Sequence, residues 1–388
     1  MRLPLEGIRI LDLSQLLPGP FCSMLLGDLG AEIVKIEPPG GDPARTMLTP
    51  GYFESINRNK KSIVLDLKNR LSKSVFFSLV ETADIVIEGF RPGTVKRLGI
   101  DYKAVRSVNH GIIYCSISGY GQSGPYRNRP GHDINYAGVA GIISLCGEPD
   151  GPPSASYGVA IVDLSSALFA TISILAAIRA RDKTGRGEYI DVSMTDAAVS
   201  LMINRIPEYF LPDGLLKEKP SARGSYGVFR TKDDKYITLG VAEDHFWLRL
   251  CKVMDRDDLK EDPRFSSWID RNKNRKELIP ILEEFFLQRT KEECIRLLVD
   301  ADIPCGPVNS IEEIFRDEHL SYRKIFDETD HPNIGKVKQV LFPVRFSETS
   351  TRIRSPAPSL GEHTEEILKD LGYTKDQIEN FRVKKVIE

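Results

Sequence analysis

The sequence predicts an α/β protein with a large, doubly wound domain built on a parallel sheet and a second, smaller domain. Over roughly the first 120 residues, short apolar runs of strand length alternate with helix-length segments, which is the β-α-β pattern of such sheets. From about Leu201 the composition changes, which favours a separate domain. A length of 388 residues accommodates two hydrophobic cores.

The first β-α-β unit begins at Ile8–Leu13 (IRILDL), an apolar run suited to a buried parallel strand. The loop SQLLPGP leads into a helix expected at 21–30, where Gly30 is a C-cap signal. A second strand is expected at 31–39, ending at Glu37 and a pair of prolines. Further strands are expected at 62–68, 84–90 and 111–121, a helix at 72–83, and a buried core helix over Leu164–Ile178.

The second half of the chain begins with a predicted linker. Residues 206–224 are rich in Pro, Gly and Lys, a composition typical of connecting segments. The strands YGVFRT and YITLGV follow, joined by the turn KDDK. Amphipathic helices are expected at 245–254, 275–289 and 291–301, extended chain at 331–349, and two more helices at 363–368 and 376–381.

Charge and cysteine content exclude several classes of function. Lys and Arg number 53 and Asp and Glu 55, a net charge of −2, so no nucleic-acid or membrane partner is expected. The six cysteines form no CxxC pair and no zinc-type spacing with histidine, which predicts no metal site. Without a secretory leader or a membrane-length apolar run, the protein is expected to be cytoplasmic.

A dinucleotide-binding site is the first function to consider for such a sheet. Glu37 ends the second strand, where a ribose-binding acid would stand. The first turn, however, reads SQLLPGP and lacks the G-x-G-x-x-G glycines that let the backbone approach a pyrophosphate. A nicotinamide enzyme is therefore not expected.

Three residues are candidates for acid/base or nucleophilic chemistry. His132 in GHDINY is either a turn histidine or a general base, and Asp133 beside it is expected to cap the following helix. Asp163 opens a long apolar helix, so it is either an N-cap or a buried carboxylate whose protonated form is favoured. Glu243 follows a predicted strand and is otherwise an exposed turn carboxylate.

Several basic residues stand at turns and could hold a phosphate group. Arg91 in EGFRPGT is the most suggestive, because it lies just beyond a strand end, where sheets of this type place ligands. The others are Arg45, Lys60, Lys61, Arg97 and Arg127.

The segments GIRILDLSQLLPGPFCSMLLGDLGAEIVKIEPPGGD, NKKSIVLDLK, ADIVIEGFRPGTVKRLG, GHDINYAGVAG and APSLGEHTEEIL together resemble the class III CoA-transferase (CaiB/BaiF) family, and most closely its α-methylacyl-CoA racemase branch. The resemblance implies a Rossmann-like CoA-binding domain built from both chain ends, a small inserted α+β domain, and an interlocked dimer. The implied division is 1–205 (large domain), 206–224 (linker), 225–318 (small domain), 319–345 (return linker) and 346–388 (large domain).

The resemblance also assigns roles to residues. His132 stands in the place of the racemase histidine, Asp163 in that of the aspartate shared by both branches, and Glu243 in that of the glutamate that supports the histidine. Departures are GEPDGPP, which is more like the transferases, and Pro38, where relatives often have Arg. The expected CoA-binding residues are Arg45, Lys60, Lys61, Arg91, Tyr126 and Arg127.

The implied activity is epimerisation of the α-carbon of 2-methylacyl-CoA thioesters by 1,1-proton transfer through an enolate. The alternative is a CoA-transferase that moves CoA between carboxylic acids through an anhydride on Asp163. A third hypothesis is an inactive CoA-binding subunit. No cofactor is expected, since CoA belongs to the substrate. The expected partner is a second copy of the chain or a paralogue.

Overall fold

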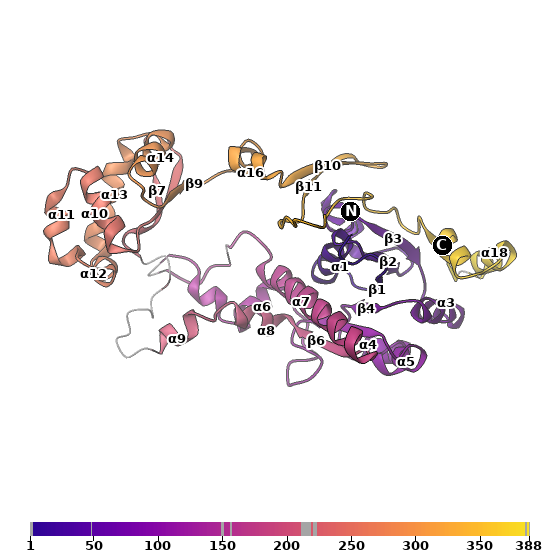
Figure 1. Cartoon of the computed structure of the whole chain (residues 1–388). Coiled ribbons are helices and arrows are strands. Elements are labelled where there is room, and N and C mark those ends of the chain that lie inside the picture. The colour runs from indigo at the N-terminus through magenta and orange to yellow at the C-terminus, as the bar shows by residue number, and fades with distance from the viewer. Residues whose placement is uncertain are drawn as a thin grey trace. The chain divides into compact units, whose positions relative to one another are not determined.

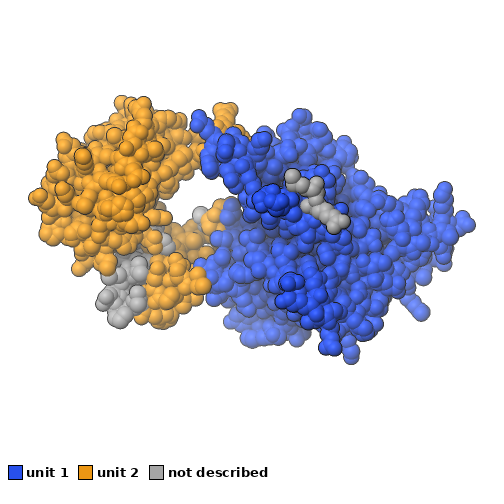
Figure 2. Space-filling view, viewed as in Figure 1, with its two compact units in different colours: residues 1–140, 159–201, 318–388 blue, residues 141–158, 202–317 orange. Residues whose placement is uncertain are grey.

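The computed structural model describes residues 3–47, 49–148, 151–155, 157–210, 219, 223–384 and 386–387. The chain divides into two compact units (Figure 2). Unit 1, blue in Figure 2, comprises Met1–Ala140, Val159–Leu201 and Glu318–Glu388, and unit 2, orange, comprises Gly141–Gly158 and Met202–Asp317. Unit 1 therefore combines segments from the first and last parts of the chain.

Unit 1 is built on a six-stranded parallel sheet, which confirms the predicted doubly wound fold (Figure 1). Its order is β3-β2-β1-β4-β5-β6, so the direction of winding reverses between β1 and β4. In sheets of this type ligands bind beyond the carboxyl ends of the strands at that reversal. The strands are β1 Arg9–Asp12, β2 Glu32–Glu37, β3 Lys60–Val64, β4 Ile85–Glu88, β5 Ile113–Ser118 and β6 Tyr189–Ser193.

The helices of unit 1 include several short ones that the sequence pattern did not predict. They are α1 Pro18–Asp28, α2 Tyr52–Ile56, α3 Arg70–Glu81, α4 Thr94–Leu98, α5 Tyr102–Val108, α6 Asp133–Val139, α7 Ile161–Thr184, α8 Met194–Ser200, α16 Glu318–Arg323, α17 Thr364–Asp370 and α18 Lys375–Val383. Ile367 of α17 and Ile378 of α18 are buried in one hydrophobic core with Val75 and Leu79 of α3. The C-terminal helices thus complete the core that the N-terminal strands begin.

Helix α7 was predicted to be a buried core helix, and this is right for one face only. Val162, Ala170 and Ile174 are buried where α7 packs against α1, β5 and β6. On the opposite face, Leu168 is 48% and Ile172 61% exposed. By length and composition α7 could also cross a membrane, a test that the core helices of many proteins pass.

The predicted return linker at 319–345 contains regular structure. An antiparallel hairpin pairs β10 (Phe326–His331) with β11 (Gly335–Val340). The extended chain expected from His331 onward therefore covers β11, whereas β10 was not predicted. The polar sequence FDETDH of β10 lacks the apolar alternation by which strands are recognised.

Unit 2 has a three-stranded antiparallel sheet of order β7-β8-β9 with helices packed on it. The strands are β7 Tyr226–Arg230, β8 Tyr236–Gly240 and β9 Cys305–Pro307, and the helices are α9 Arg205–Tyr209, α10 Asp244–Val253, α11 Asp257–Glu261, α12 Trp268–Lys273, α13 Arg275–Leu287, α14 Lys291–Asp300 and α15 Ile311–Ile314. The strands and helices expected between 226 and 301 are all present. The predicted linker at 206–224 overlaps α9, and its residues 211–218 and 220–222 lie outside the described residues.

Candidate active site

Asp163 lies in the first turn of α7 with its side chain partly buried. Burial, and to a smaller extent the nearby carboxylate of Asp133, raise the pKa of its carboxyl group to about 7. Near neutral pH the group is therefore divided between a carboxylic acid and a carboxylate. A carboxyl group with this pKa can accept a proton or act as a nucleophile once it is ionised.

Asp133 holds the beginning of α7 in place. One of its carboxylate oxygens, Oδ1, accepts hydrogen bonds from the backbone N–H groups of Val162 (2.8 Å) and Asp163 (3.0 Å). The prediction that Asp133 caps its own helix, α6, is wrong, because residue 133 is already the first residue of α6 and its side chain reaches α7 instead. The N-cap of α6 is His132.

His132 has an exposed side chain, and its backbone N–H donates to Oδ1 of Asn135 (2.9 Å). Because the next residue binds the N–H of Asp163, the N-termini of α6 and α7 are adjacent. His132 and Asp163 therefore lie at neighbouring helix ends.

Two tyrosines interact electrostatically with the Asp163 carboxylate, and neither was selected from the sequence. The negative charge of Asp163 contributes, after burial, to a raised pKa for Tyr52. Burial raises the pKa of Tyr136 to about 12, with Tyr120 and Asp163 adding to it and Arg91 opposing it. Tyr136 stands one helical turn after His132, a spacing that could have pointed to it.

A tight fit holds Tyr136 in place. Its hydroxyl donates to the carbonyl of Gly131 (2.6 Å), and its ring meets Tyr120 edge to face. A Cβ atom on Gly119 would lie 2.3 Å from the ring, and one on Gly131 would lie 2.7 Å from it. Both glycines are therefore required by the approach of the ring to the backbone.

Glu243 belongs to unit 2, where it is the N-cap of α10. Its side chain is exposed, and its carbonyl accepts from the N–H groups of Phe246 (3.1 Å) and Trp247 (3.2 Å). Since His132 belongs to unit 1, a hydrogen bond between the two side chains stays a prediction.

A cavity of about 290 Å³ lies at the carboxyl ends of the strands where the winding reverses. Gln15 follows β1, Pro38 follows β2, Lys68 follows β3 and Phe90 follows β4, while Arg97 comes from α4. The lining is largely apolar and also contains two cationic side chains, Lys68 and Arg97, and two carboxylates, Asp66 and Glu37, of which Glu37 is paired with Arg45. Gln15 and Lys68 were missed, because no single motif marks residues that only the strand order brings together.

Three of the expected CoA-binding residues already bind other groups of the protein with their side chains. Arg45 binds both carboxylate oxygens of Glu37 (2.8 Å each), and the ammonium of the buried Lys60 binds Asp12, Pro20 and Asn57. Lys61 pairs with two surface glutamates. This placement argues against these three residues as phosphate ligands, since their donors already satisfy carboxylates or carbonyls.

The other three expected CoA-binding residues are more accessible. Arg91 is exposed, and no carboxylate pairs with it among the residues that the structure describes. Tyr126 is partly buried, with the guanidinium of Arg129 3.4 Å from its ring centre. Arg127 is exposed and lines a separate cavity of about 340 Å³ together with Lys96 and Lys103.

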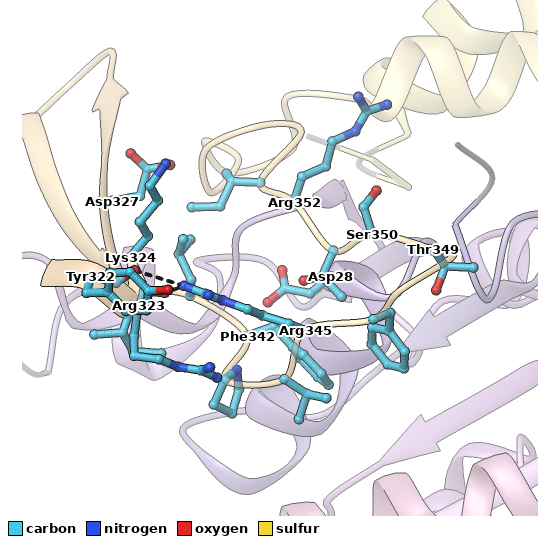
Figure 3. Close-up of a pocket in the computed structure, with 17 residues that line it drawn as sticks. Asp28, Tyr322, Arg323, Lys324, Asp327, Phe342, Arg345, Thr349, Ser350 and Arg352 are labelled. Carbon is cyan, nitrogen blue, oxygen red and sulfur yellow. Dashed lines mark hydrogen bonds between the residues drawn. The ribbon is translucent and has the colours of Figure 1, made fainter. Parts of the chain in front are cut away.

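A larger cavity, of about 720 Å³, lies elsewhere in unit 1 (Figure 3). Asp28 and residues between Tyr322 and Ile353 line it, and a guanidinium nitrogen of Arg345 donates to the Tyr322 carbonyl (3.1 Å). None of its lining residues is one of the predicted site residues, so cavity size alone does not mark the site.

Comparison with known proteins places the chain among CoA-transferases. It is 36% identical to the succinyl-CoA:glutarate CoA-transferase of Mus musculus, over 99% of this chain and 90% of that protein. It is 33% identical to the succinyl-CoA–D-citramalate CoA-transferase of Chloroflexus aurantiacus, over 99% and 98%. The crystal structure of a CAIB/BAIF family protein from Brucella suis superimposes with a TM-score of 0.84 at 31% identity, over 96% of this chain and all of that one.

These relatives bear on the two activities that the resemblance left open. Both enzymes are named as CoA-transferases, which favours the alternative activity over the expected racemase. The sequence model of CoA-transferase family III matches residues 5–364. The chain belongs to CoA-transferase family III.

Proposed function

We propose that the protein is a CoA-transferase that moves CoA between carboxylic acids, with Asp163 as the nucleophile. The observation that carries the proposal is the partly buried Asp163 carboxyl group at the start of α7, whose pKa is raised to about 7. A carboxylate held in this environment is more basic than one in water, so it is a better nucleophile toward a thioester. The names of the relatives support the same reaction type.

In the proposed reaction, an ionised oxygen of Asp163 attacks the thioester carbonyl of the donor, and the C–S bond breaks. The products are an anhydride between Asp163 and the donor acid, and the CoA thiolate. The thiolate then attacks the Asp163 carbonyl carbon, which releases the donor acid and leaves a CoA thioester on the aspartate. The acceptor carboxylate then attacks the aspartyl thioester, which forms an anhydride with Asp163 and releases the CoA thiolate. The thiolate attacks the acceptor's carbonyl carbon in this anhydride, which gives the acceptor's CoA thioester and regenerates the Asp163 carboxylate.

We infer that CoA enters through the cavity at the winding reversal. Its apolar lining suits the flat adenine ring, while Arg97 and Lys68 supply charges that attract phosphate groups. Arg91 directly follows Phe90 of this cavity in the chain, and its charge acts on Tyr136, which also interacts electrostatically with Asp163. The reaction uses only the aspartate and its two substrates, so no cofactor is required beyond the CoA that the substrate carries.

The proposed substrates are dicarboxylic acids, with succinyl-CoA as the donor. This step rests on the relatives, whose names specify succinyl-CoA with glutarate in one case and with D-citramalate in the other. A pair of related Chloroflexus chains is named as the α and β subunits of a succinyl-CoA–L-malate CoA-transferase. Glutarate, citramalate and malate are therefore the first acceptors to test.

The test is CoA transfer from succinyl-CoA to these acceptors, with hydroxylamine added during turnover. Hydroxylamine should convert an acyl-aspartate into a hydroxamate at Asp163, found by peptide mass spectrometry. Asp163→Ala should form neither product nor hydroxamate, while His132→Ala should keep activity within about tenfold, because the transfer needs no general base.

A second experiment tests for racemase activity. Incubation with 2-methylacyl-CoA in D₂O should give no exchange of the α-proton. Exchange that requires both His132 and Asp163, without transfer to any acid, would overturn the transferase proposal.

We also propose that the active protein is a dimer of two identical chains in the cytoplasm. The exposed apolar face of α7, with Leu168, Phe169 and Ile172, gives the physical reason for self-association. The interlocked arrangement implied by the family resemblance would cover this face. A dimer with a paralogue is the alternative, since some relatives are named as paired subunits.

A further inference from the structure

Helix α7 begins in an unusual way, because the cap of its first turn comes from another helix. Ala160, the residue at its N-cap, has no hydroxyl, amide or carboxylate that could bind the free N–H groups. Asp133 of α6 supplies the missing acceptor, and one oxygen serves the N–H groups of both Val162 and Asp163. The nucleophile's own backbone is therefore tied to a second carboxylate.

We infer that Asp133 is a positioning residue that fixes the first turn of α7 and keeps the Asp163 carboxylate basic through its negative charge. The inference rests on the proposed CoA-transferase function of Asp163 and adds a second residue to it. Asp133 acts through Asp163 and need not touch the substrate.

The charge of Asp133 is what distinguishes it from an ordinary cap. Asparagine or serine would accept the same hydrogen bonds, and either would be neutral. A negative charge beside Asp163 disfavours its ionised form, which is consistent with the raised pKa of that group. Because of the charge on Asp133, a larger fraction of Asp163 is protonated near neutral pH. Once ionised, however, the Asp163 carboxylate has a higher proton affinity and is therefore more nucleophilic.

Among the residues that the structure describes, no cation lowers the pKa of Asp163 and so cancels this effect. The charge of Asp163 acts on Tyr52 from α2 and Tyr136 from α6, and both phenols are neutral near pH 7, since their pKa values lie above the ordinary value of 10. Arg91 acts on Tyr136 and opposes its raised pKa. Burial and Asp133 are the two causes that raise the pKa of Asp163.

Two substitutions separate the hydrogen bonds from the charge. Asp133→Asn keeps an oxygen acceptor for Val162 and Asp163 and removes the charge, while Asp133→Ala removes both. A matched control is Asp101→Asn, since Asp101 caps α5 in the same unit through the N–H of Ala104 (3.3 Å) and has no recorded influence on Asp163.

The kinetic measurement is kcat and KM for succinyl-CoA against pH. The wild type should lose kcat/KM below a pKa of about 7. Asp133→Asn should move this acid limb to lower pH, with kcat at pH 8 reduced several-fold. Asp133→Ala should lose about 10- to 100-fold in kcat with little change in KM, because the first turn is no longer fixed. Asp101→Asn should match the wild type.

A titration independent of activity keeps this inference separate from the proposed function. The ¹³C signal of the Asp163 carboxyl group, assigned by its loss in Asp163→Asn, should titrate at lower pH in Asp133→Asn than in the wild type. If the wild type transfers no CoA while the signal shifts in this way, the proposed function fails and the coupling stands. If neither the signal nor the acid limb moves in Asp133→Asn, and Asp133→Ala keeps kcat within twofold, Asp133 has no positioning role.

Discussion

At the scale of the single residue, Asp163 binds its proton more tightly in the folded protein than in the unfolded chain. Its pKa is about 7 when folded and 3.8 for an unperturbed side chain. Between these values the folded state holds a proton that the unfolded state has released. The free energy of unfolding therefore falls as pH rises from about 4 to 7, and the full penalty is present above pH 7.

Asp163→Asn should for this reason stabilise the protein while abolishing CoA transfer. At pH 8 we expect the free energy of unfolding to rise by about 1–3 kcal/mol, and the gain should shrink toward pH 5, where the wild-type carboxyl is protonated. Urea unfolding at the two pH values measures this difference. An equal effect at both pH values would show that the carboxyl group is not destabilised by ionisation.

Arg97, one of two cationic residues that line the cavity at the winding reversal, gives a second prediction at this scale. Arg97→Ala should raise KM for succinyl-CoA by about tenfold and leave kcat nearly unchanged, because a phosphate contact is equally strong in the ground and transition states. Arg106→Ala, on α5 and outside this cavity, serves as the control. Unchanged KM in Arg97→Ala would place the CoA phosphates elsewhere.

At the scale of secondary-structure elements, buried charges join the strands beneath the loop 13–20. Lys60 at the start of β3 reaches Asp12 at the end of β1 (3.1 Å), and both side chains are fully buried. Ser23 of α1 donates to the same Asp12 carboxylate (2.5 Å). Burial opposes the charge of Asp12, but these partners and Lys35 outweigh it and hold its pKa well below the usual range. The network therefore fixes where α1 begins relative to the sheet.

Lys60→Met should destabilise the protein strongly, because Asp12 would keep a buried charge without its nearest partner. We expect a loss of about 3 kcal/mol in the free energy of unfolding. The neighbouring Lys61 pairs only with surface glutamates, so Lys61→Met should cost less than about 1 kcal/mol. If both variants lost a similar free energy of unfolding, burial of the Lys60–Asp12 pair would not be the cause of the destabilisation.

Strands β1 to β5 of the sheet could be predicted from the sequence, whereas the edge strand β6 could not. Strands β1 to β5 are runs of buried residues, and this gives them a clear apolar signal. The edge strand β6 reads YIDVS, exposes Tyr189, and passes directly into α8 through Ser193, so neither periodicity nor a turn marks it. The short α4 and α5 are likewise too brief for a helical period.

The candidate site was predictable in its chemistry and not in its contacts. Asp163 stood out because a carboxylate opens an apolar helix. Which member of the pair His132 and Asp133 reaches Asp163 depends on how α6 packs against α7, and this contact joins residues 30 positions apart. Lys60 and Lys61 are adjacent in sequence, yet only the pleat of β3 decides that Lys60 points inward.

At the scale of the whole molecule, we expect two chains to associate through the exposed face of α7. Ile172→Lys places a charge at the centre of this apolar face, so we expect it to convert a dimer into monomers. Light scattering after gel filtration measures the mass. Val383→Lys changes a still more exposed apolar residue on α18, so the measured mass should stay that of two chains. A wild type that is monomeric at micromolar concentration would overturn the dimer proposal.

The division of unit 1 between distant segments has a consequence for the nascent chain on the ribosome. Leu368 and Ile378 cover the same core as Phe76 and Leu79, yet they are translated after all of unit 2. At ordinary elongation rates, α3 waits roughly 15 to 60 s for these partners. The later and nearly continuous unit 2 can thus finish folding first, while the core of unit 1 stays incomplete until the last helices emerge.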